Sequence, residues 1–96
     1  MATYGLKEHV INEIISAARR SGVQKLVLFG SRAKGNYSRA SDIDLAVYGG
    51  NAALFAEEAE ETVSTLLRFD VVDMGGHLSA NFRKQIEEGI ALYEKI

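Results

Sequence analysis

The chain has 96 residues, of which 47% are hydrophobic and 25% are charged. These values are ordinary for a globular protein and leave no room for two folding units, so we expect one domain over residues 1–96. Cysteine is absent, which excludes disulfides, thiolate metal sites and cysteine nucleophiles. Because the sequence also lacks a membrane-length apolar stretch and a signal-like N-terminus, we expect a cytoplasmic protein without membrane contact.

The charges are divided unevenly along the chain. Residues 1–50 carry seven Lys or Arg and four Asp or Glu, a net charge of +3, whereas residues 51–96 carry four and nine, a net charge of −5. The basic residues of the first half gather around a glycine-rich stretch: Lys25, Arg32, Lys34 and Arg39. So small a cluster suits a small anion better than a nucleic-acid backbone, so nucleic acid is not expected as a partner.

The first half of the chain predicts one helix and two strands. Apolar residues recur at helical spacing from Leu6 to Ala18, two arginines follow, and Gly22 is a suitable C-terminal cap. Residues 25–29 form a short apolar run that is typical of an interior strand. A second strand is expected over residues 43–48, after a small, polar and basic loop.

The second half predicts a helix over residues 52–67, a strand over residues 68–74 and a final helix from Ser79 to Tyr93. The first of these helices would bury Phe55, Ala59, Val63, Leu66 and Leu67, and the last would bury Phe82, Ile86, Ile90 and Tyr93. Gly89, inside the last helix, indicates a tight packing contact or a bend. The order α-β-β-α-β-α predicts an α/β (α+β) fold with a small mixed sheet flanked by helices.

Two carboxylates open the second predicted strand. Because alternate side chains of a strand share a face, Asp42 and Asp44 lie side by side while Ile43 points into the core. Two adjacent anions are tolerated if they are solvated, if one is protonated, or if a hard divalent cation lies between them. Mg²⁺ or Mn²⁺ with substrate phosphates fits such a donor set, which points to a nucleoside triphosphate.

A phosphate cradle is expected directly after the first strand. Gly30 has no Cβ and lets a phosphate approach the backbone, while Ser31 offers a hydroxyl and an N–H. Residues 31–34 can open a short helix, from which Arg32 or Lys34 would add charge-assisted hydrogen bonds. A Walker-type phosphate loop is excluded, because Gly35 is not followed by Lys and Ser or Thr.

The pattern Gly30-Ser31, ten residues, then Asp42-Ile43-Asp44 resembles the signature of the minimal nucleotidyltransferases, a small branch of the DNA polymerase β-like superfamily. The resemblance covers nearly the whole chain and implies that Asp42 and Asp44 hold two Mg²⁺ ions. It also implies a third acidic residue on a later strand, matched by Asp70, which would bind metal and act as a base. Asp73 is the rival, but in a regular strand it faces away from Asp70, and its other role is to accept a hydrogen bond in the following glycine turn.

The resemblance also implies a partner and a reaction. Minimal nucleotidyltransferases similar to this chain act as antitoxins that transfer AMP from ATP to a tyrosine of a helical HEPN toxin. Two alternatives remain: the chain neutralises its partner by binding alone, through its acidic second half, or it transfers a nucleotide to an RNA end or a small molecule. Exposed strand edges also allow self-association or a hetero-oligomer. The nucleotide base and the acceptor hydroxyl are left open.

Overall fold

The computed structural model describes residues 4–95. Within that range the chain forms four helices and four strands, which alternate along the sequence. In chain order they are α1 (Glu8–Arg20), β1 (Lys25–Phe29), α2 (Gly30–Lys34), β2 (Ile43–Tyr48), α3 (Ala52–Thr62), β3 (Phe69–Asp73), α4 (Ala80–Glu87) and β4 (Ile90–Glu94).

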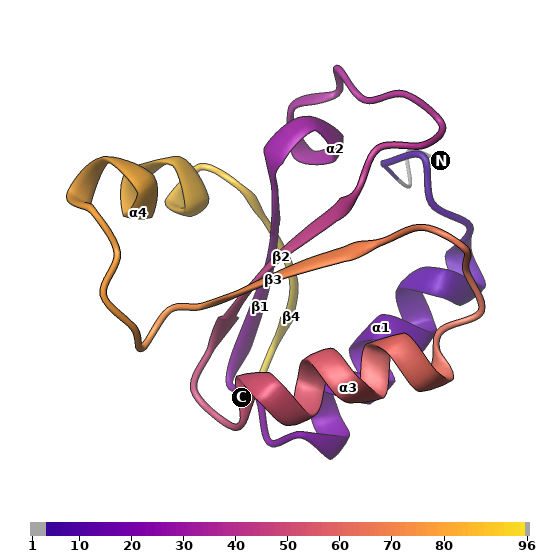
Figure 1. The fold of residues 1–96 in the computed structure, drawn as a ribbon, viewed down its shortest axis with the longest axis horizontal. Helices are drawn as coiled ribbons and strands as arrows, with labels where there is room; N and C mark the ends of the chain where they lie inside the picture. The colour runs from indigo at the N-terminus through magenta and orange to yellow at the C-terminus, as the bar shows by residue number, and fades with distance from the viewer. Residues whose placement is uncertain (1–3, 96) are drawn as a thin grey trace.

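The four strands form one mixed sheet in the order β3-β2-β1-β4 (Figure 1). β1 runs antiparallel to both β2 and β4, whereas β2 and β3 are parallel. Parallel neighbours need a crossover connection, which α3 supplies between β2 and β3. The predicted fold class, a small mixed sheet flanked by helices, is confirmed.

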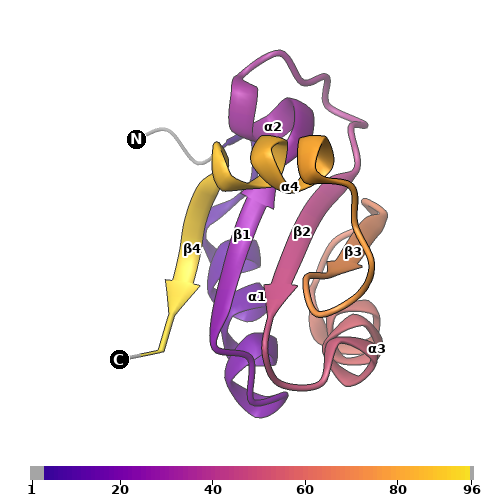
Figure 2. The same ribbon diagram turned by 90° about the vertical axis from the view of Figure 1, so that its left-hand side faces the viewer.

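Helices cover the two faces of the sheet unequally. In Figure 2, α4 lies in front of the sheet and α1 and α3 lie behind it. The α1/α3 face holds the larger core, whose fully buried members include Ile14, Leu28, Leu45 and Phe55. The α4 face holds a smaller cluster of Val27, Phe29, Ala46, Met74 and Ile86. In that cluster the ring of Phe82 packs edge-on against Phe29, with 5.9 Å between the ring centroids.

The predicted helix from Ser79 to Tyr93 is wrong in its second half. Ser79 is indeed the N-cap, and its side chain accepts a hydrogen bond from the backbone N–H of Phe82. The helix ends at Glu87, however, and residues 90–94 pair with β1 as a fourth strand. Gly89 lies between the two, and a Cβ there would contact the Leu28 carbonyl oxygen. The glycine therefore marks both the tight contact and the change of direction.

The helix expected over residues 52–67 ends earlier, at Thr62. Val63 is already extended, and the following Ser64 donates from its backbone N–H and its hydroxyl to the carboxylate of Glu13 on α1. Thr62, Val63 and Thr65 are β-branched, which disfavours continuing the helix. As a result Leu66 does not join the helix face and is fully exposed.

The first helix and its expected cap are confirmed. α1 ends at Arg20, and Gly22 adopts a positive φ of 71° while its N–H bonds to the Arg19 carbonyl oxygen. The N–H groups of Ser21 and Val23 bond to the carbonyl oxygens of Ala17 and Ala18. These bonds satisfy carbonyls that a helix end otherwise leaves free.

None of the helices formed by residues 4–95 combines the length and apolar character needed to cross a lipid bilayer.

Candidate active site

The strand register brings the two predicted motifs together. Phe29, the last residue of β1, pairs with Asp44 near the start of β2, so Gly30 and Ser31 follow directly beside the carboxylates. Asp44 also pairs with Asp70 of the parallel strand β3. Neighbouring strands lie about 4.8 Å apart, so paired residues of this kind are adjacent on one face. The cradle residues and the acidic residues, although distant in sequence, therefore meet at one end of the sheet.

The face that each acidic residue occupies follows from its neighbours. Ile43 and Leu45 are fully buried in the α1/α3 core, so Asp44 between them projects from the α4 face. Val72 packs in the α4-face cluster, and therefore Asp70, two residues earlier, projects from the α4 face as well.

Asp73 lies on the opposite face from Asp70. Its Oδ1 accepts a hydrogen bond of 2.9 Å from the backbone N–H of Gly75. It thus has the turn-capping role that the sequence offered as its alternative. Of the two candidates for the third carboxylate, Asp70 is the one beside Asp44.

Gly30 is in contact with the carboxylate of Asp44. Its φ is +75°, and a Cβ placed on it would contact Asp44 Oδ2 and lie 3.1 Å from Asp44 Cγ. A residue with a side chain would occupy the place of the carboxylate. Gly30 also begins the five-residue helix α2, so the sequence-based expectation of a short helix after the first strand is confirmed. Ser31 is partly exposed at the start of that helix.

The carboxylates influence one another electrostatically. Burial raises the pKa of the Asp44 carboxyl above its ordinary value, and the neighbouring charges of Asp70 and Asp42 raise that pKa further. The positive charge of Arg32 opposes this rise in the pKa. Asp42 and Asp70 are exposed, whereas Asp44 is partly buried beside Gly30. The site therefore concentrates negative charge in a place open to a ligand.

A divalent cation fits this donor set. The negative charges of Asp70 and Asp42, which raise the pKa of Asp44, are what a cation would neutralise, and carboxylate oxygens are the ligands that Mg²⁺ and Mn²⁺ prefer. Over residues 4–95, no three His, Asp or Glu side chains converge tightly enough to enclose an ion by themselves. Mg²⁺ usually takes one or two carboxylates and completes its shell with waters and substrate phosphates.

The two basic residues expected to bind phosphate have different surroundings. Lys34 is exposed and lines a hollow of about 140 Å³ between α2 and α4. Phe29, Gly30 and Ala33 line the same hollow, opposite Gln85, Glu88 and Gly89. Arg32, by contrast, is only 1% exposed, and its guanidinium donates to the backbone carbonyl oxygens of Tyr4, Arg39 and Ser41. Contact between Arg32 and phosphate stays a prediction.

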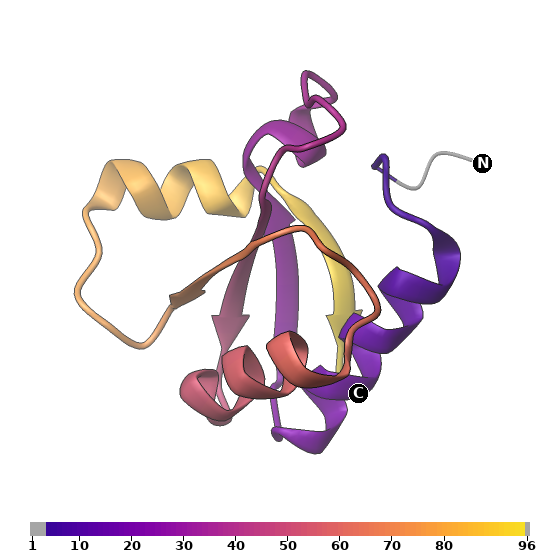
Figure 3. The same ribbon diagram turned by 45° about the vertical axis from the view of Figure 1, so that its right-hand side comes forward.

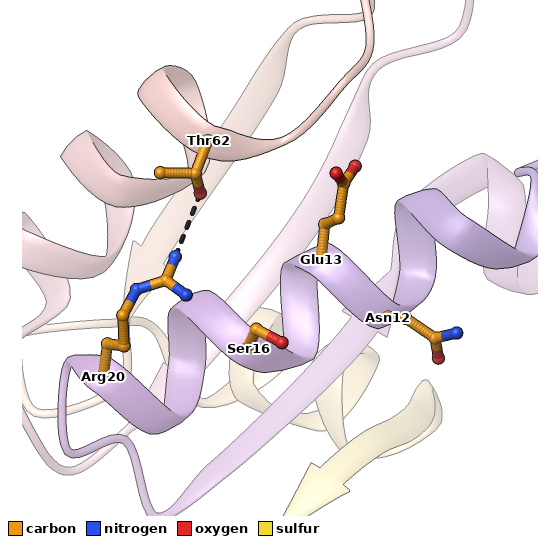
Figure 4. A pocket seen from close by; sticks show the side chains of 5 residues that line it. All are labelled: Asn12, Glu13, Ser16, Arg20 and Thr62. Atoms are coloured by element: carbon orange, nitrogen blue, oxygen red, sulfur yellow. Dashed lines mark hydrogen bonds between the residues drawn. The ribbon is translucent and has the colours of Figure 1, made fainter.

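Two larger hollows lie away from the carboxylates. One, of about 290 Å³, lies between α1 and α3, where Arg20 donates to Thr62 across the gap (Figure 4). Its polar lining comes from the helices of the opposite sheet face, and no cradle glycine or acidic pair adjoins it. The other, of about 320 Å³, is lined by residues 5–7 and 64–67 together with His9 and Val10. Neither contains a residue of the predicted site.

Sequence reasoning missed the part of the site that comes from the N-terminal segment. The carbonyl oxygen of Tyr4 accepts from Arg32, and a Cβ on Gly5 would contact the ring of Tyr37. The signal available was Gly5 itself, a glycine just before the first predicted helix. Sequence alone does not say which distant loop such a glycine accommodates.

Residues 11–96 match the family described as Polymerase beta, Nucleotidyltransferase. A Methanocaldococcus jannaschii protein, provisionally named a protein adenylyltransferase, is 39% identical over 46 residues. That match covers 45% of this chain and 46% of the relative, so the similar region spans about half of the relative's length.

The chain resembles solved structures more strongly in its fold than in its sequence. A toxin–antitoxin complex with AMP-PNP contains a chain 27% identical, with a TM-score of 0.66, over 88% of this chain and 73% of that one. A complex of an MNT antitoxin with the tri-AMPylated HEPN toxin of Shewanella oneidensis gives 23% identity and a TM-score of 0.64. That match covers 90% of this chain and 71% of the other.

Proposed function

The chain belongs to the polymerase β nucleotidyltransferase family, and on that premise we propose that it transfers AMP from ATP to a hydroxyl group of a partner protein. The observation that carries this proposal is the register that sets Asp44 beside both Asp70 and the end of β1. It unites an acidic trio with a glycine cradle on one open face. In-line transfer of a nucleotidyl group requires both features.

Each part of the site has a task in the proposed reaction. The backbone at Gly30 and the N–H and hydroxyl of Ser31 bind the triphosphate, and Lys34 compensates part of its charge. Asp70 accepts the proton of the acceptor hydroxyl as its oxygen attacks the α-phosphate. A bond forms from that oxygen to the α-phosphorus, the bond to the bridging oxygen breaks, and pyrophosphate leaves with the electron pair.

Asp42, Asp44 and Asp70 are the residues that would hold Mg²⁺, or Mn²⁺ in its place. Two such ions, when bound, lower the pKa of an attacking hydroxyl and neutralise charge on the triphosphate. The raised pKa of Asp44 supports this assignment, because beyond its burial the negative charges of Asp70 and Asp42 both raise it.

The proposed acceptor is a tyrosine of a helical toxin of the HEPN class, which makes the chain an antitoxin. Two of the similar structures support this choice, since one contains AMP-PNP and the other an AMPylated HEPN toxin. The exposed carboxylates also leave room for a macromolecular acceptor at the end of the sheet. The proposed location is the cytoplasm, in keeping with a cysteine-free chain.

Intact-mass spectrometry tests the proposal directly. The chain is incubated with a HEPN protein from the same genome, Mg²⁺ and each of the four ribonucleoside triphosphates in turn. We expect the HEPN protein to gain the mass of AMP with ATP, and peptide mapping to locate the adduct on tyrosine. Asp42→Asn and Asp70→Asn should abolish the adduct.

Asp73→Asn is the matched control for these variants. It makes the same chemical change on the same strand as Asp70→Asn, and the Asn side chain can still accept the hydrogen bond of the Gly75 N–H. We expect full transfer from this variant. If no adduct forms while the two proteins still co-purify and the toxin is silenced, the chain acts by binding and the proposed reaction is wrong.

A further inference from the structure

Among residues 4–95, the largest fully buried side chain is a charged one. Arg32 is 1% exposed, yet no carboxylate lies within ion-pair distance of it in the part of the chain that the structure describes. Burying an unpaired charge is costly unless hydrogen bonds compensate it. The contacts of this guanidinium therefore need an explanation of their own.

Backbone carbonyl groups on both sides provide that compensation. Nε and Nη2 donate to the Ser41 carbonyl oxygen at 3.1 and 2.8 Å, and Nη2 also approaches the Arg39 carbonyl oxygen at 3.4 Å. Nη1 donates to the Tyr4 carbonyl oxygen at 3.1 Å. Ser41 directly precedes Asp42. The planar guanidinium of Arg32, called its fork below, therefore holds the peptide group that joins Ser41 to Asp42, the first residue of the acidic pair.

The loop adds bonds of its own around the same point. The backbone N–H of Ser38 donates to the Ser41 hydroxyl at 2.8 Å, and the Ser41 N–H donates to the Ser38 carbonyl oxygen at 3.2 Å. These two bonds close a small turn just before Asp42. The turn places two hydrogen-bond acceptors near Arg32, because the carbonyl oxygens of residues 39 and 41 both point to its guanidinium.

Residues 4 and 5, here called the N-terminal segment, cover the side of the Arg32 guanidinium that faces away from the loop of residues 36–42. The ring of Tyr37 lies 5.2 Å from the guanidinium of Arg32, and a Cβ on Gly5 would contact that ring and lie 2.8 Å from Arg32 Nη1. Figure 3 shows the chain just before α1, from residue 4 onward, at the same end of the molecule as α2 and the loop that follows it. Arg32 is thus enclosed between residues 4–5 and the loop of residues 36–42.

We infer that Arg32 is a positioning residue, which ties the N-terminal segment to the loop of residues 36–42 and so holds the Asp42 carboxylate in place beside Asp44. In this role it acts through the backbone carbonyl groups that it contacts. The effect on metal binding and transfer rests on the function proposed above, whereas the ordering of the loop does not.

Lysine cannot reproduce this arrangement. An ammonium group is a point charge, whereas the planar guanidinium directs its N–H groups to carbonyls on opposite sides at once. Arg32→Lys keeps the positive charge and removes the fork. The variant therefore separates the charge of Arg32 from its geometry.

Hydrogen exchange and metal binding together test the inference. Backbone exchange of residues 36–42 is measured by mass spectrometry in the wild type, in Arg32→Lys and in Ile14→Val. The last is a core variant on α1 that lowers stability away from the loop, since Ile14 is fully buried there. Binding of Mn²⁺ in the presence of AMP-PNP is measured on the same three proteins.

We expect Arg32→Lys to speed exchange in residues 36–42 and to weaken Mn²⁺ binding by about ten- to one-hundredfold, the usual cost of losing an outer partner of a metal ligand. Ile14→Val should change neither. Gly5→Ala, which introduces a Cβ against Tyr37 and Arg32, should speed the same exchange without altering any charge. In transfer assays at saturating Mn²⁺, the KM for ATP should stay close to that of the wild type.

Other results overturn the inference. Unchanged exchange of residues 36–42 in Arg32→Lys would show that the fork does not order the loop. Weaker binding of AMP-PNP without metal would show that Arg32 is a direct phosphate ligand. If the wild type binds no Mn²⁺ and transfers no nucleotide, the proposed function fails, while the exchange data still decide whether Arg32 holds the loop.

Discussion

The two faces of the sheet contrast in how completely helices cover them. α1 and α3 close one face over a continuous apolar core, in which Leu26, Leu28, Leu45 and Phe55 are fully buried. The other face is covered by α4, whose Ile86 and Phe82 pack on a smaller cluster. Beyond that cluster the same face carries Asp44 and Asp70 in place of apolar side chains, and Asp42 directly precedes β2.

This difference separates stability from chemistry within a small sheet. Apolar burial supplies most of the favourable free energy of folding, and the covered face provides most of it here. The open end can then hold like charges that oppose folding. The clearest expectation is that substitutions on the covered face change stability, whereas substitutions at the open end change activity.

Phe55→Ala on the covered face should have the largest effect on stability. Phe55 is fully buried in the α1/α3 core, and losing a buried Phe ring costs about 3–5 kcal/mol. Leu54→Ala is the matched control on the same helix, since Leu54 is 40% exposed and its truncation should cost about 0.5 kcal/mol or less. Denaturant unfolding measures both, and equal losses would contradict the contrast between core and surface.

Gly30→Ala should have the largest effect at the open end. The new Cβ takes the place of the Asp44 carboxylate, and we expect nucleotidyl transfer to fall about a hundredfold or more. Gly35→Ala is the control, because Gly35 also has a positive φ but a Cβ there would meet no atom within 4 Å. Both variants carry backbone strain of about 1–3 kcal/mol. Comparable transfer by the two would mean that Gly30 is needed only for its backbone conformation.

Asp44→Asn should stabilise the protein at neutral pH in the absence of metal, although we expect it to abolish the proposed transfer. The pKa of Asp44 is raised in the folded state, so ionisation of this group favours unfolding. The penalty appears as the pH rises above the ordinary value of 3.8 and is complete above the raised pKa. The gain in Tm over the wild type should therefore shrink as the pH falls.

Thermal melts across this pH range measure the effect of Asp44→Asn. Asp73→Asn, on the opposite face, should show no comparable gain at neutral pH. A Tm for Asp44→Asn below that of the wild type at neutral pH would mean that the carboxylate stabilises the fold, contrary to the separation of roles proposed above.

Glu13→Gln should have the smallest effect, and of opposite sign. Hydrogen bonds from the Ser64 backbone N–H and hydroxyl lower the pKa of Glu13, with a contribution from His9. Its stabilisation is present above the ordinary value of 4.5 and is lost as the pH falls through the lowered pKa. The variant should melt slightly below the wild type at neutral pH and match it in acid. Glu57→Gln, an exposed change on α3, should melt like the wild type throughout.

Local patterns in the sequence determined the elements that lead to the site. Strands at residues 25–29 and 43–48, the cap of α1 and the pairing of a glycine cradle with an acidic pair were all readable from short stretches. Alternation along a strand separated Asp70 from Asp73, since it depends only on neighbouring residues. The strands, the cap and the opposite faces of Asp70 and Asp73 were predicted correctly because each rests on interactions within one element, whereas the approach of the cradle to the acidic pair depends on the register of β1 with β2.

Tertiary structure decided what periodicity could not. Residues 90–94 fit a helical spacing as well as a strand, and only pairing with β1 and the contact of Gly89 with Leu28 selected the strand. Arg32 likewise has a basic side chain beside a phosphate cradle in the sequence, yet its fork meets carbonyls from residues 4, 39 and 41. The sequence alone determined which residues are candidates for the chemistry, because residue type and local spacing define them. Which of them contact substrate and which hold others in place depends on distant backbone groups, and those meet only when the chain folds.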